Sequence, residues 1–323
     1  MPIGLVRVTN VHPMALHEIT FTSHNDRDTI HGWIYQPVRP ARGVVHLIHG
    51  LGEHSRRYLH LITVLLDAGF VVAADDHAGH GKTAAESGIW ADSGDDGAET
   101  AVADEQILRS RVRNLYPDLP YIVFGHSWGS MIARPLAARL GDDLAGLILC
   151  GIAAQIPGAD AFDRTKIAAE PDRAAPADLT YVGTLFDGFV SRYGDGAGPT
   201  DWVARSPEVV ADHAVDPLNN VGAPMSVRFL QGFVELYDRA NSDEWYTSIR
   251  PDLPVLILAG DQDPVTNYGE GAYHVANTLV ATGHPNVRAR VYSGFRHEVH
   301  NEPEIRDDVE AEVVAFAEGV CGE

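Results

Sequence analysis

The chain has 323 residues, of which 45 % are hydrophobic and 21 % charged, as in an ordinary globular protein. Its 45 acidic and 24 basic residues give a formal net charge of −21 with neutral histidines. This balance argues against a nucleic-acid-binding protein, because such proteins need a basic surface to meet the phosphates. The two cysteines, Cys150 and Cys321, offer neither a disulfide framework nor a zinc-ligand spacing.

Targeting signals are not evident in the sequence. The N-terminal stretch MPIGLVRVTNVHPM lacks the basic start and apolar centre of a signal peptide. No apolar run approaches the roughly 20 residues that a membrane-spanning helix needs. We therefore expect a soluble cytoplasmic protein.

Short apolar segments alternate with helical patterns along most of the chain. Two segments that alternate polar and apolar residues predict an opening hairpin, and the later apolar strands alternate with helices, which is typical of a mainly parallel sheet covered on both faces. The fold class is therefore α/β. The expected strands are 17–23, 29–38, 44–48, 70–74, 121–124, 144–149, 254–259 and 287–292, and the expected helices are 55–67 with Ser55 as its cap, 98–115, 128–140, 270–281 and about 303–319.

The interval 152–240 breaks this alternation. It contains proline and glycine breaks, six aromatic residues between 162 and 202, and no strong strand pattern. A segment of this length is too long for an ordinary loop. We expect a helical cap formed by 152–240 over the carboxyl edge of the sheet, where open α/β sheets bind ligands, with residues 1–151 and 241–323 forming the core. A peripheral helical decoration is the alternative.

A candidate nucleophile lies in the stretch GHSWGS, residues 125–130. Ser127 follows a predicted strand and precedes a predicted helix, which is the context of a G-x-S-x-G nucleophile elbow. Small residues at 125 and 129 allow a tight turn, and the helix N-terminus favours developing negative charge. An ordinary turn serine is the alternative.

A serine nucleophile needs a base, and the base needs an orienting acid. His297 follows the last predicted strand, with His300 as a competitor. Asp261 and Asp263 both follow the strand before it, and their positions alone do not choose between them. The order Ser, Asp, His is that of the α/β-hydrolases.

The oxyanion hole is expected to combine two backbone N–H groups, from Trp128 and from Leu51 in the glycine-rich loop HGLGEH at 49–54. Metal sites are not expected. HEVH at 297–300 lacks the i, i+4 histidine spacing of HExxH, and DDHAGHG at 75–81 has no further cluster to complete a ligand set. No nucleotide-binding signature is present, so no cofactor is expected.

Five ordered motifs resemble the monoacylglycerol lipase and lysophospholipase group of α/β-hydrolases, of the serine aminopeptidase S33 type. They are HGLGEHSRRY (49–58), DHAGHGKT (76–83), GHSWGS (125–130), GDQDPV (260–265) and SGFRHEVHNE (293–302), and the resemblance extends from about residue 17 to 318. The resemblance implies an α/β-hydrolase fold, Ser127 as nucleophile, His297 as base, Asp263 rather than Asp261 as acid, and the N–H groups of Leu51 and Trp128 as oxyanion donors.

The same resemblance implies that Glu53 and Arg57 support the site, although a weak surface ion pair is the alternative. Three positions depart from the group. Trp128 stands where methionine is usual, Ser130 where glycine is frequent, and Ala78 where arginine is common. The Trp128 ring in particular can reshape the pocket.

The expected function is cofactor-free hydrolysis of carboxylic esters with an apolar acyl group, such as monoacylglycerols or lysophospholipids. A short-chain or aryl-ester esterase is the main alternative, because Trp128 can shorten the acyl pocket. A serine aminopeptidase is less favoured, since no carboxylate cluster for a free amine is evident in 152–240. A non-catalytic binding protein would not need all three members of a triad.

Overall fold

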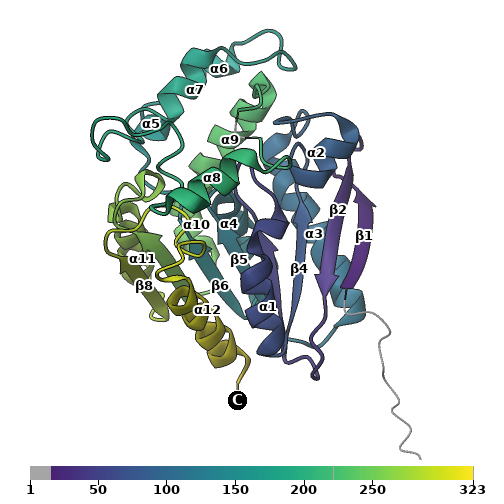
Figure 1. Ribbon diagram of the computed structural model, residues 1–323. Helices are drawn as coiled ribbons and strands as arrows, with labels where there is room; N and C mark the ends of the chain where they lie inside the picture. The colour runs from purple at the N-terminus through teal and green to yellow at the C-terminus, as the bar shows by residue number, and fades with distance from the viewer. Residues whose placement is uncertain (1–15, 221, 323) are drawn as a thin grey trace, which may run out of the picture.

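The computed structural model describes residues 16–220 and 222–322. Its centre is an eight-stranded sheet in the order β1-β2-β4-β3-β5-β6-β7-β8 (Figure 1). The first two strands form an antiparallel hairpin, β2 pairs antiparallel with β4, and the strands from β4 to β8 run parallel. The strands are β1 (Leu16–Thr22), β2 (Thr29–Tyr35), β3 (Gly43–Ile48), β4 (Phe70–Asp76), β5 (Tyr121–His126), β6 (Gly146–Cys150), β7 (Val255–Gly260) and β8 (Val287–Tyr292).

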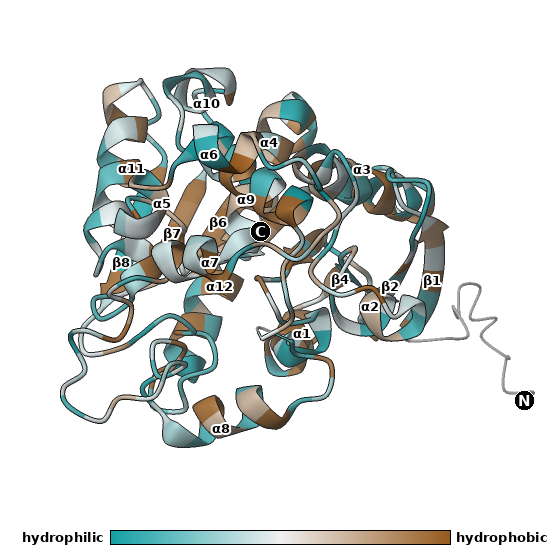
Figure 2. Cartoon of the chain, turned by 90° about the horizontal axis from the view of Figure 1, so that it is seen from above, coloured by the Kyte–Doolittle hydropathy of each residue, from teal (hydrophilic) through white to brown (hydrophobic). Residues whose placement is uncertain are grey.

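Helices cover both faces of this sheet, as the apolar strands predict. One face packs against α1 (Leu59–Asp67) and α12 (Arg306–Cys321), and the other against α3 (Gly97–Leu115), α4 (Trp128–Leu140) and α11 (Glu270–Ala281). Seen from above, the hydrophobic strands β6 and β7 lie inside, between helices with hydrophilic outer surfaces (Figure 2). The other helices are α2 (Gly81–Ser87), α5 (Pro157–Asp160), α6 (Arg164–Ala168), α7 (Leu179–Leu185), α8 (Pro207–Val215), α9 (Val227–Ala240) and α10 (Asp243–Ser248), with 3-10 turns at Ser55–Tyr58, Gly141–Asp143 and Pro264–Thr266.

Strand β3 shows how the two layers arise from the sequence. All six of its residues are buried, and successive side chains of a strand point to opposite faces. Val45 and Leu47 join the apolar cluster of α1 and α12, while Val44 and Ile48 join that of α3 and α4. His46 alternates with Val45 and Leu47, so it points toward α3, where it meets Glu105.

The predicted cap at Ser55 is wrong. Ser55 begins a 3-10 turn, and α1 itself begins at Leu59. The Ser55 hydroxyl and backbone N–H both donate to Asp76 Oδ1, at 2.7 and 2.9 Å. This carboxylate at the end of β4 therefore takes the hydroxyl that would otherwise cap the helix.

The interval 152–240 is helical, as expected. Helices α5 to α8 lie beyond the carboxyl ends of the strands (Figure 1). Helix α9, which ends the interval, packs on α3 and α4 of the core layer. The division into a core of 1–151 and 241–323 and a cap of 152–240 stays a prediction, and residues 1–15 lie outside the described part of the chain.

Within 16–220 and 222–322, we find no helix with both the length and the apolar character that crossing a bilayer requires.

Candidate active site

Ser127 occupies a strained turn between β5 and α4. Its backbone has φ 56° and ψ −120°, a conformation that residues other than glycine adopt only at a cost in free energy. A Cβ at Gly129 would collide with the carbonyl of Ile48, and a Cβ at Gly125 with that of Gly129. The two glycines of the motif are thus needed for close packing, and the turn places Ser127 on the wall of a cavity.

His297 and Asp263 form a buried pair beside this turn. His297 Nδ1 lies 2.9 Å from Asp263 Oδ2, and both residues are at most 2 % exposed. Burial disfavours the charged imidazole, but the charge and hydrogen bond of Asp263 outweigh burial and raise the pKa of His297. The other ring nitrogen, Nε2, has no hydrogen-bond partner in the described part of the chain, and His297 lines the same cavity as Ser127.

The competing residues lie elsewhere. Asp261 accepts hydrogen bonds from the Ser293 hydroxyl and the Gly294 N–H at 2.8 and 2.7 Å, and it makes none to His297. His300 is fully buried and stacks on the Tyr58 ring with centroids 4.8 Å apart. It does not line the cavity.

The two residues predicted to supply the oxyanion donors share the cavity with Ser127. Leu51 and Trp128 both line the cavity. Neither backbone N–H has an acceptor among residues 16–220 and 222–322. An oxyanion hole requires such unpartnered N–H groups.

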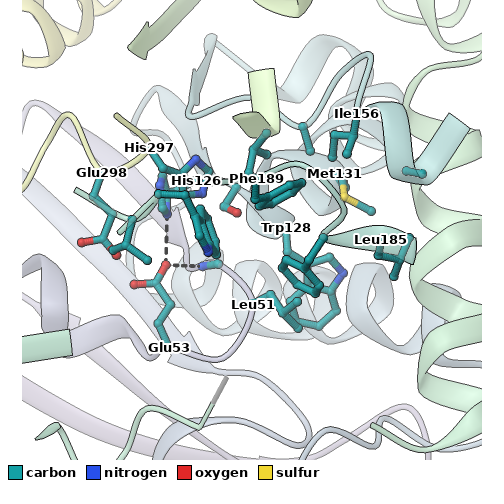
Figure 3. A pocket seen from close by; sticks show the side chains of 18 of the residues that line it. Leu51, Glu53, His126, Trp128, Met131, Ile156, Leu185, Phe189, His297 and Glu298 are labelled. Carbon is teal, nitrogen blue, oxygen red and sulfur yellow. Dashed lines mark hydrogen bonds and ion pairs between the residues drawn. The ribbon is translucent and has the colours of Figure 1, made fainter. Parts of the chain in front are cut away.

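Glu53 connects the loop of Leu51 to the elbow. Its Oε1 accepts a hydrogen bond from His126 Nδ1 at 3.0 Å (Figure 3). The same oxygen accepts from the Gly50 N–H and from the Tyr58 hydroxyl, both at 2.6 Å. Burial alone would raise the pKa of Glu53, but the hydrogen bond of His126 and the charge of Arg57 hold this pKa well below its usual value. The carboxylate thus stays ionised and ties the residue before Ser127 to the loop of Leu51.

Arg57 extends this network to the loop of His297. Its guanidinium pairs with Glu53 at 3.0 Å and with both oxygens of Glu298, the residue after His297. The three side chains are at most 4 % exposed. The pair is therefore not a surface ion pair, and it joins the loops that bear Leu51 and His297.

Two departures from the family pattern have structural roles. The Ser130 hydroxyl donates to the Ser127 carbonyl at 2.6 Å and accepts from the Ala153 N–H at 3.1 Å. The Trp128 ring is 3 % exposed and stacks on His80, with centroids 4.9 Å apart and an angle of 26°. It also contacts Phe229 of α9, so the ring fills part of the cavity wall.

The cavity between the sheet edge and the helices of 152–240 encloses about 690 Å³ of space between atoms, part of it open to solvent. In Figure 3, polar side chains including Glu53, His297 and Glu298 gather on one side, and Met131 and Leu185 lie on the other. The apolar lining consists of Leu51, Trp128, Met131, Ala153, Ile156, Ala159, Leu185, Phe186, Phe189, Trp202, Val203, Phe233 and Val265.

Sequence reasoning missed a buried cluster below the Leu51 loop. Asp75 and His77 meet Glu105 of α3, and one ligand-type atom from each lies within 4.8 Å of the others. The motif at 75–81 alone did not suggest it, because Glu105 lies about 30 residues further along the chain. The available signal was a glutamate in the middle of an otherwise apolar helix face, formed by Ala98, Ala101, Val102, Leu108 and Val112.

A mainly parallel sheet with a strained serine between a strand and a helix defines an α/β-hydrolase. The family model described as "Serine aminopeptidase, S33" matches residues 39–304, and the chain belongs to this family. The expected resemblance is therefore confirmed.

The relatives specify the type of α/β-hydrolase. The chain is 30 % identical to a monoacylglycerol lipase of Mycolicibacterium smegmatis over 285 residues, which cover 87 % of this chain and 91 % of that protein. A solved structure described as "Lipase (Open form)" is 52 % identical, with a TM-score of 0.93, and covers 96 % of this chain and 100 % of its own. A thermostable carboxyl esterase from Bacillus coagulans, in complex with glycerol, is 47 % identical with a TM-score of 0.92 and the same coverage. The chain is thus an α/β-hydrolase of the monoacylglycerol lipase type.

Proposed function

We propose that this protein hydrolyses carboxylic esters through Ser127, His297 and Asp263, and that its substrates are of the monoacylglycerol or lysophospholipid type. The observation that supports this most is the pairing of Asp263 with His297 at 2.9 Å on the wall of the cavity that also holds the strained Ser127. The names of the relatives, monoacylglycerol lipase and carboxyl esterase, agree with this chemistry.

In the proposed mechanism, His297 Nε2 takes the proton of the Ser127 hydroxyl as Oγ bonds to the ester carbonyl carbon. The carbonyl oxygen becomes an oxyanion and accepts hydrogen bonds from the N–H groups of Leu51 and Trp128. The imidazolium then gives its proton to the departing alcohol oxygen as the C–O bond breaks. Water attacks the acyl-enzyme in the same way, which releases the carboxylic acid and restores the Ser127 hydroxyl.

The cavity supports an apolar acyl group and a polar alcohol. Its apolar side, with Met131 and Leu185, offers the hydrophobic contact that an acyl chain needs. His213 of α8 lines its polar side, where the negative charges of Glu298 and Glu53 act on the imidazole. An alcohol that bears hydroxyl groups would find hydrogen-bond partners there.

A short-chain or aryl-ester esterase is the second candidate. The bulky Trp128 ring forms part of the cavity wall. One relative of 47 % identity is described as a carboxyl esterase. A peptidase is less favoured, because no carboxylate cluster for a free amine is evident in the sequence of 152–240. A non-catalytic binding protein is also less favoured, because it would not need all three members of a triad.

A panel of substrates separates these functions. We would compare monoacylglycerols and p-nitrophenyl esters of two to sixteen carbons with an aminoacyl p-nitroanilide. We expect ester turnover with a maximum above eight carbons, and Ser127→Ala to lower kcat by at least about 10⁴-fold. Ser110→Ala, on the exposed face of α3, is the matched control and should keep full activity.

Three outcomes would contradict the proposal at different levels. Turnover of esters by Ser127→Ala at the wild-type rate would refute the mechanism. A maximum at two to four carbons would select the short-chain esterase. Preference for the anilide would select the aminopeptidase.

A further inference from the structure

Two histidines outside the proposed triad hold the loop that bears Leu51. His49 Nδ1 lies 2.8 Å from the Gly50 carbonyl oxygen, and His49 Nε2 accepts the backbone N–H of His77 at 3.2 Å. Because a backbone N–H can only donate, Nε2 is the acceptor and Nδ1 bears the proton. The His49 ring is therefore neutral, and burial with the neighbouring charge of His77 lowers its pKa well below the usual value.

The bond from His49 decides where the Leu51 N–H points. The Gly50 carbonyl and the Leu51 N–H belong to one planar peptide group, and in the trans form they point in opposite directions. Holding the Gly50 oxygen on one side directs the Leu51 N–H to the other side. The preceding peptide is held as well, because the Gly50 N–H donates to Glu53.

His77 supports this arrangement from below. Its ring is nearly parallel to that of His49, with centroids 3.8 Å apart and an angle of 22°. His77 Nε2 lies 3.3 Å from the His49 carbonyl oxygen. Its Nδ1 lies 3.1 Å from Glu105 Oε1 and 3.3 Å from Asp75 Oδ1.

Every atom that faces the two nitrogens of His77 is an oxygen acceptor. A ring that bears protons on both nitrogens suits all of these oxygens, and we infer that His77 is an imidazolium. A buried cation is tolerated only beside opposite charge, which Asp75 and Glu105 supply from β4 and α3. Burial would lower the pKa of His77, but its closeness to these two carboxylates raises it well above the usual value.

Further titratable groups face this cluster, and burial together with the charge of Glu105 raises the pKa of Asp75 to about 6. His46 Nε2 lies 2.6 Å from the other oxygen of Glu105, and His46 Nδ1 lies 2.9 Å from the Tyr121 hydroxyl. Glu105 is thereby hydrogen-bonded at Oε2, while its Oε1 and both oxygens of Asp75 make no hydrogen bond of good geometry within the described residues. Asp75 contributes mainly its charge.

His77 also touches the second half of the oxyanion hole. The Trp128 ring stands edge to face with the His77 ring, with centroids 5.4 Å apart and an angle of 84°. His80, three residues after His77, stacks on the Trp128 indole. One buried ring therefore contacts both segments that supply the proposed donors, Leu51 and Trp128.

We propose that His77 is a permanently charged positioning residue for the oxyanion hole. Its Nε2–H holds the His49 carbonyl, its ring supports the His49 ring, and His49 in turn orients the Leu51 N–H. This inference rests on the proposed ester hydrolysis, and His77 itself touches no substrate.

Two amide variants of equal charge separate the two roles of the ring. His77→Gln places an amide N–H near the position of Nε2, within reach of the His49 carbonyl. His77→Asn places it near Nδ1, beside the carboxylates, and leaves the His49 carbonyl without a donor. We expect kcat to fall less than 10-fold in His77→Gln and about 10²-fold in His77→Asn, with KM changed less than about threefold, since one oxyanion donor contributes about 10²- to 10³-fold.

Binding of a trifluoromethyl ketone that mimics the tetrahedral intermediate provides the second readout. Its affinity should fall in parallel with kcat, because the hole acts on the transition state and not on the bound ester. His284→Asn is the matched control. This buried histidine also lies between two backbone carbonyls, of Leu279 and Ile249, and its variant should lose thermal stability but keep kcat.

Nitrogen-15 NMR of the histidine-labelled wild-type protein tests the protonation without any variant having to fold well. At pH 8, both nitrogens of His77 should be protonated, and His49 should be neutral with its proton on Nδ1. A neutral His77 ring, or a metal ion bound stoichiometrically at Nδ1 by elemental analysis, would overturn the proposal. So would equal kcat values in the two amide variants of an enzyme that hydrolyses esters, whereas absence of ester turnover in the wild type would refute the proposed function instead.

Discussion

Arg134 is the largest fully buried side chain of the protein's described part, and none of its hydrogen-bond partners is a carboxylate. From α4 its guanidinium donates to the carbonyls of Ser130 at 3.0 Å, Ala240 at 2.9 Å and Ala153 at 2.6 Å, and to Asn241 Oδ1 at 2.9 Å. Ala153 and Ala240 lie at the two ends of the interval 152–240. One cation therefore fastens both ends of the insertion to the helix that follows Ser127.

The cost of removing this cation follows from its partners. Burial lowers the pKa of Arg134 to about 10, so the group is still charged at neutral pH. Arg134→Met keeps an unbranched side chain of similar length but leaves up to three buried carbonyls without this donor, each at a cost of about 1 to 3 kcal/mol. Relief from burying the charge offsets part of this cost. We expect a net destabilisation of about 3 to 5 kcal/mol, and a smaller loss in Arg134→Lys, which keeps one or two bonds.

Urea unfolding followed by circular dichroism measures this difference, and Arg139→Met is the matched control. Arg139 lies on the same helix, is about one-third exposed, and pairs with Glu99. Its replacement should cost less than about 1 kcal/mol. For a chain of this size, each kcal/mol lowers Tm by roughly 2 °C, so Arg134→Met should melt about 6 to 10 °C lower. Equal stability of the two methionine variants would refute the reasoning.

Three further predictions concern the site and the core. Asp263→Asn should lower kcat for ester hydrolysis by about 10³- to 10⁴-fold, whereas Asp261→Asn should change kcat less than about threefold, and equal losses would contradict the assignment. Trp128→Met should shift the preferred acyl chain toward longer esters, because the indole fills cavity wall; an unchanged chain-length profile would show that the ring does not limit the pocket. Burial raises the pKa of Asp104 to about 7, despite hydrogen bonds from the His24 N–H and the Ser23 hydroxyl. The native state therefore holds this proton more tightly than the unfolded state, and the resulting stability is complete below about pH 4 and lost as the pH rises through 7. Relative to Asp104→Asn, the wild-type free energy of unfolding should decrease by about 2 to 4 kcal/mol between pH 4 and pH 8, and a constant difference over this range would refute the assigned shift.

Local patterns of the sequence predicted much of the fold. Polar and apolar alternation identified the two strands of the hairpin, and apolar β-branched runs identified most of the others, all to within a few residues, because a strand buried on both faces must be largely apolar. Helix α4 was predicted with its observed bounds, since the elbow before it and Gly141 after it mark its ends. Ser55 was predicted wrongly because a serine before a helix is only a potential cap, and the distant Asp76 took its hydroxyl.

The sequence by itself determined which residues could form the site, and the tertiary structure decided which of them meet. Asp261 and Asp263 follow the same strand, and only the approach of the His297 loop to the end of β7 places Asp263, rather than Asp261, at 2.9 Å from the imidazole. His77 and Glu105 have no relation in the sequence, but β4 and α3 bring them to 3.1 Å. The alternation of polar and apolar residues along a strand and their periodicity along a helix involve neighbouring residues, so the sequence alone shows them. The charge that a buried histidine bears depends on the oxygens around it, and those come from segments that only the folded chain brings together.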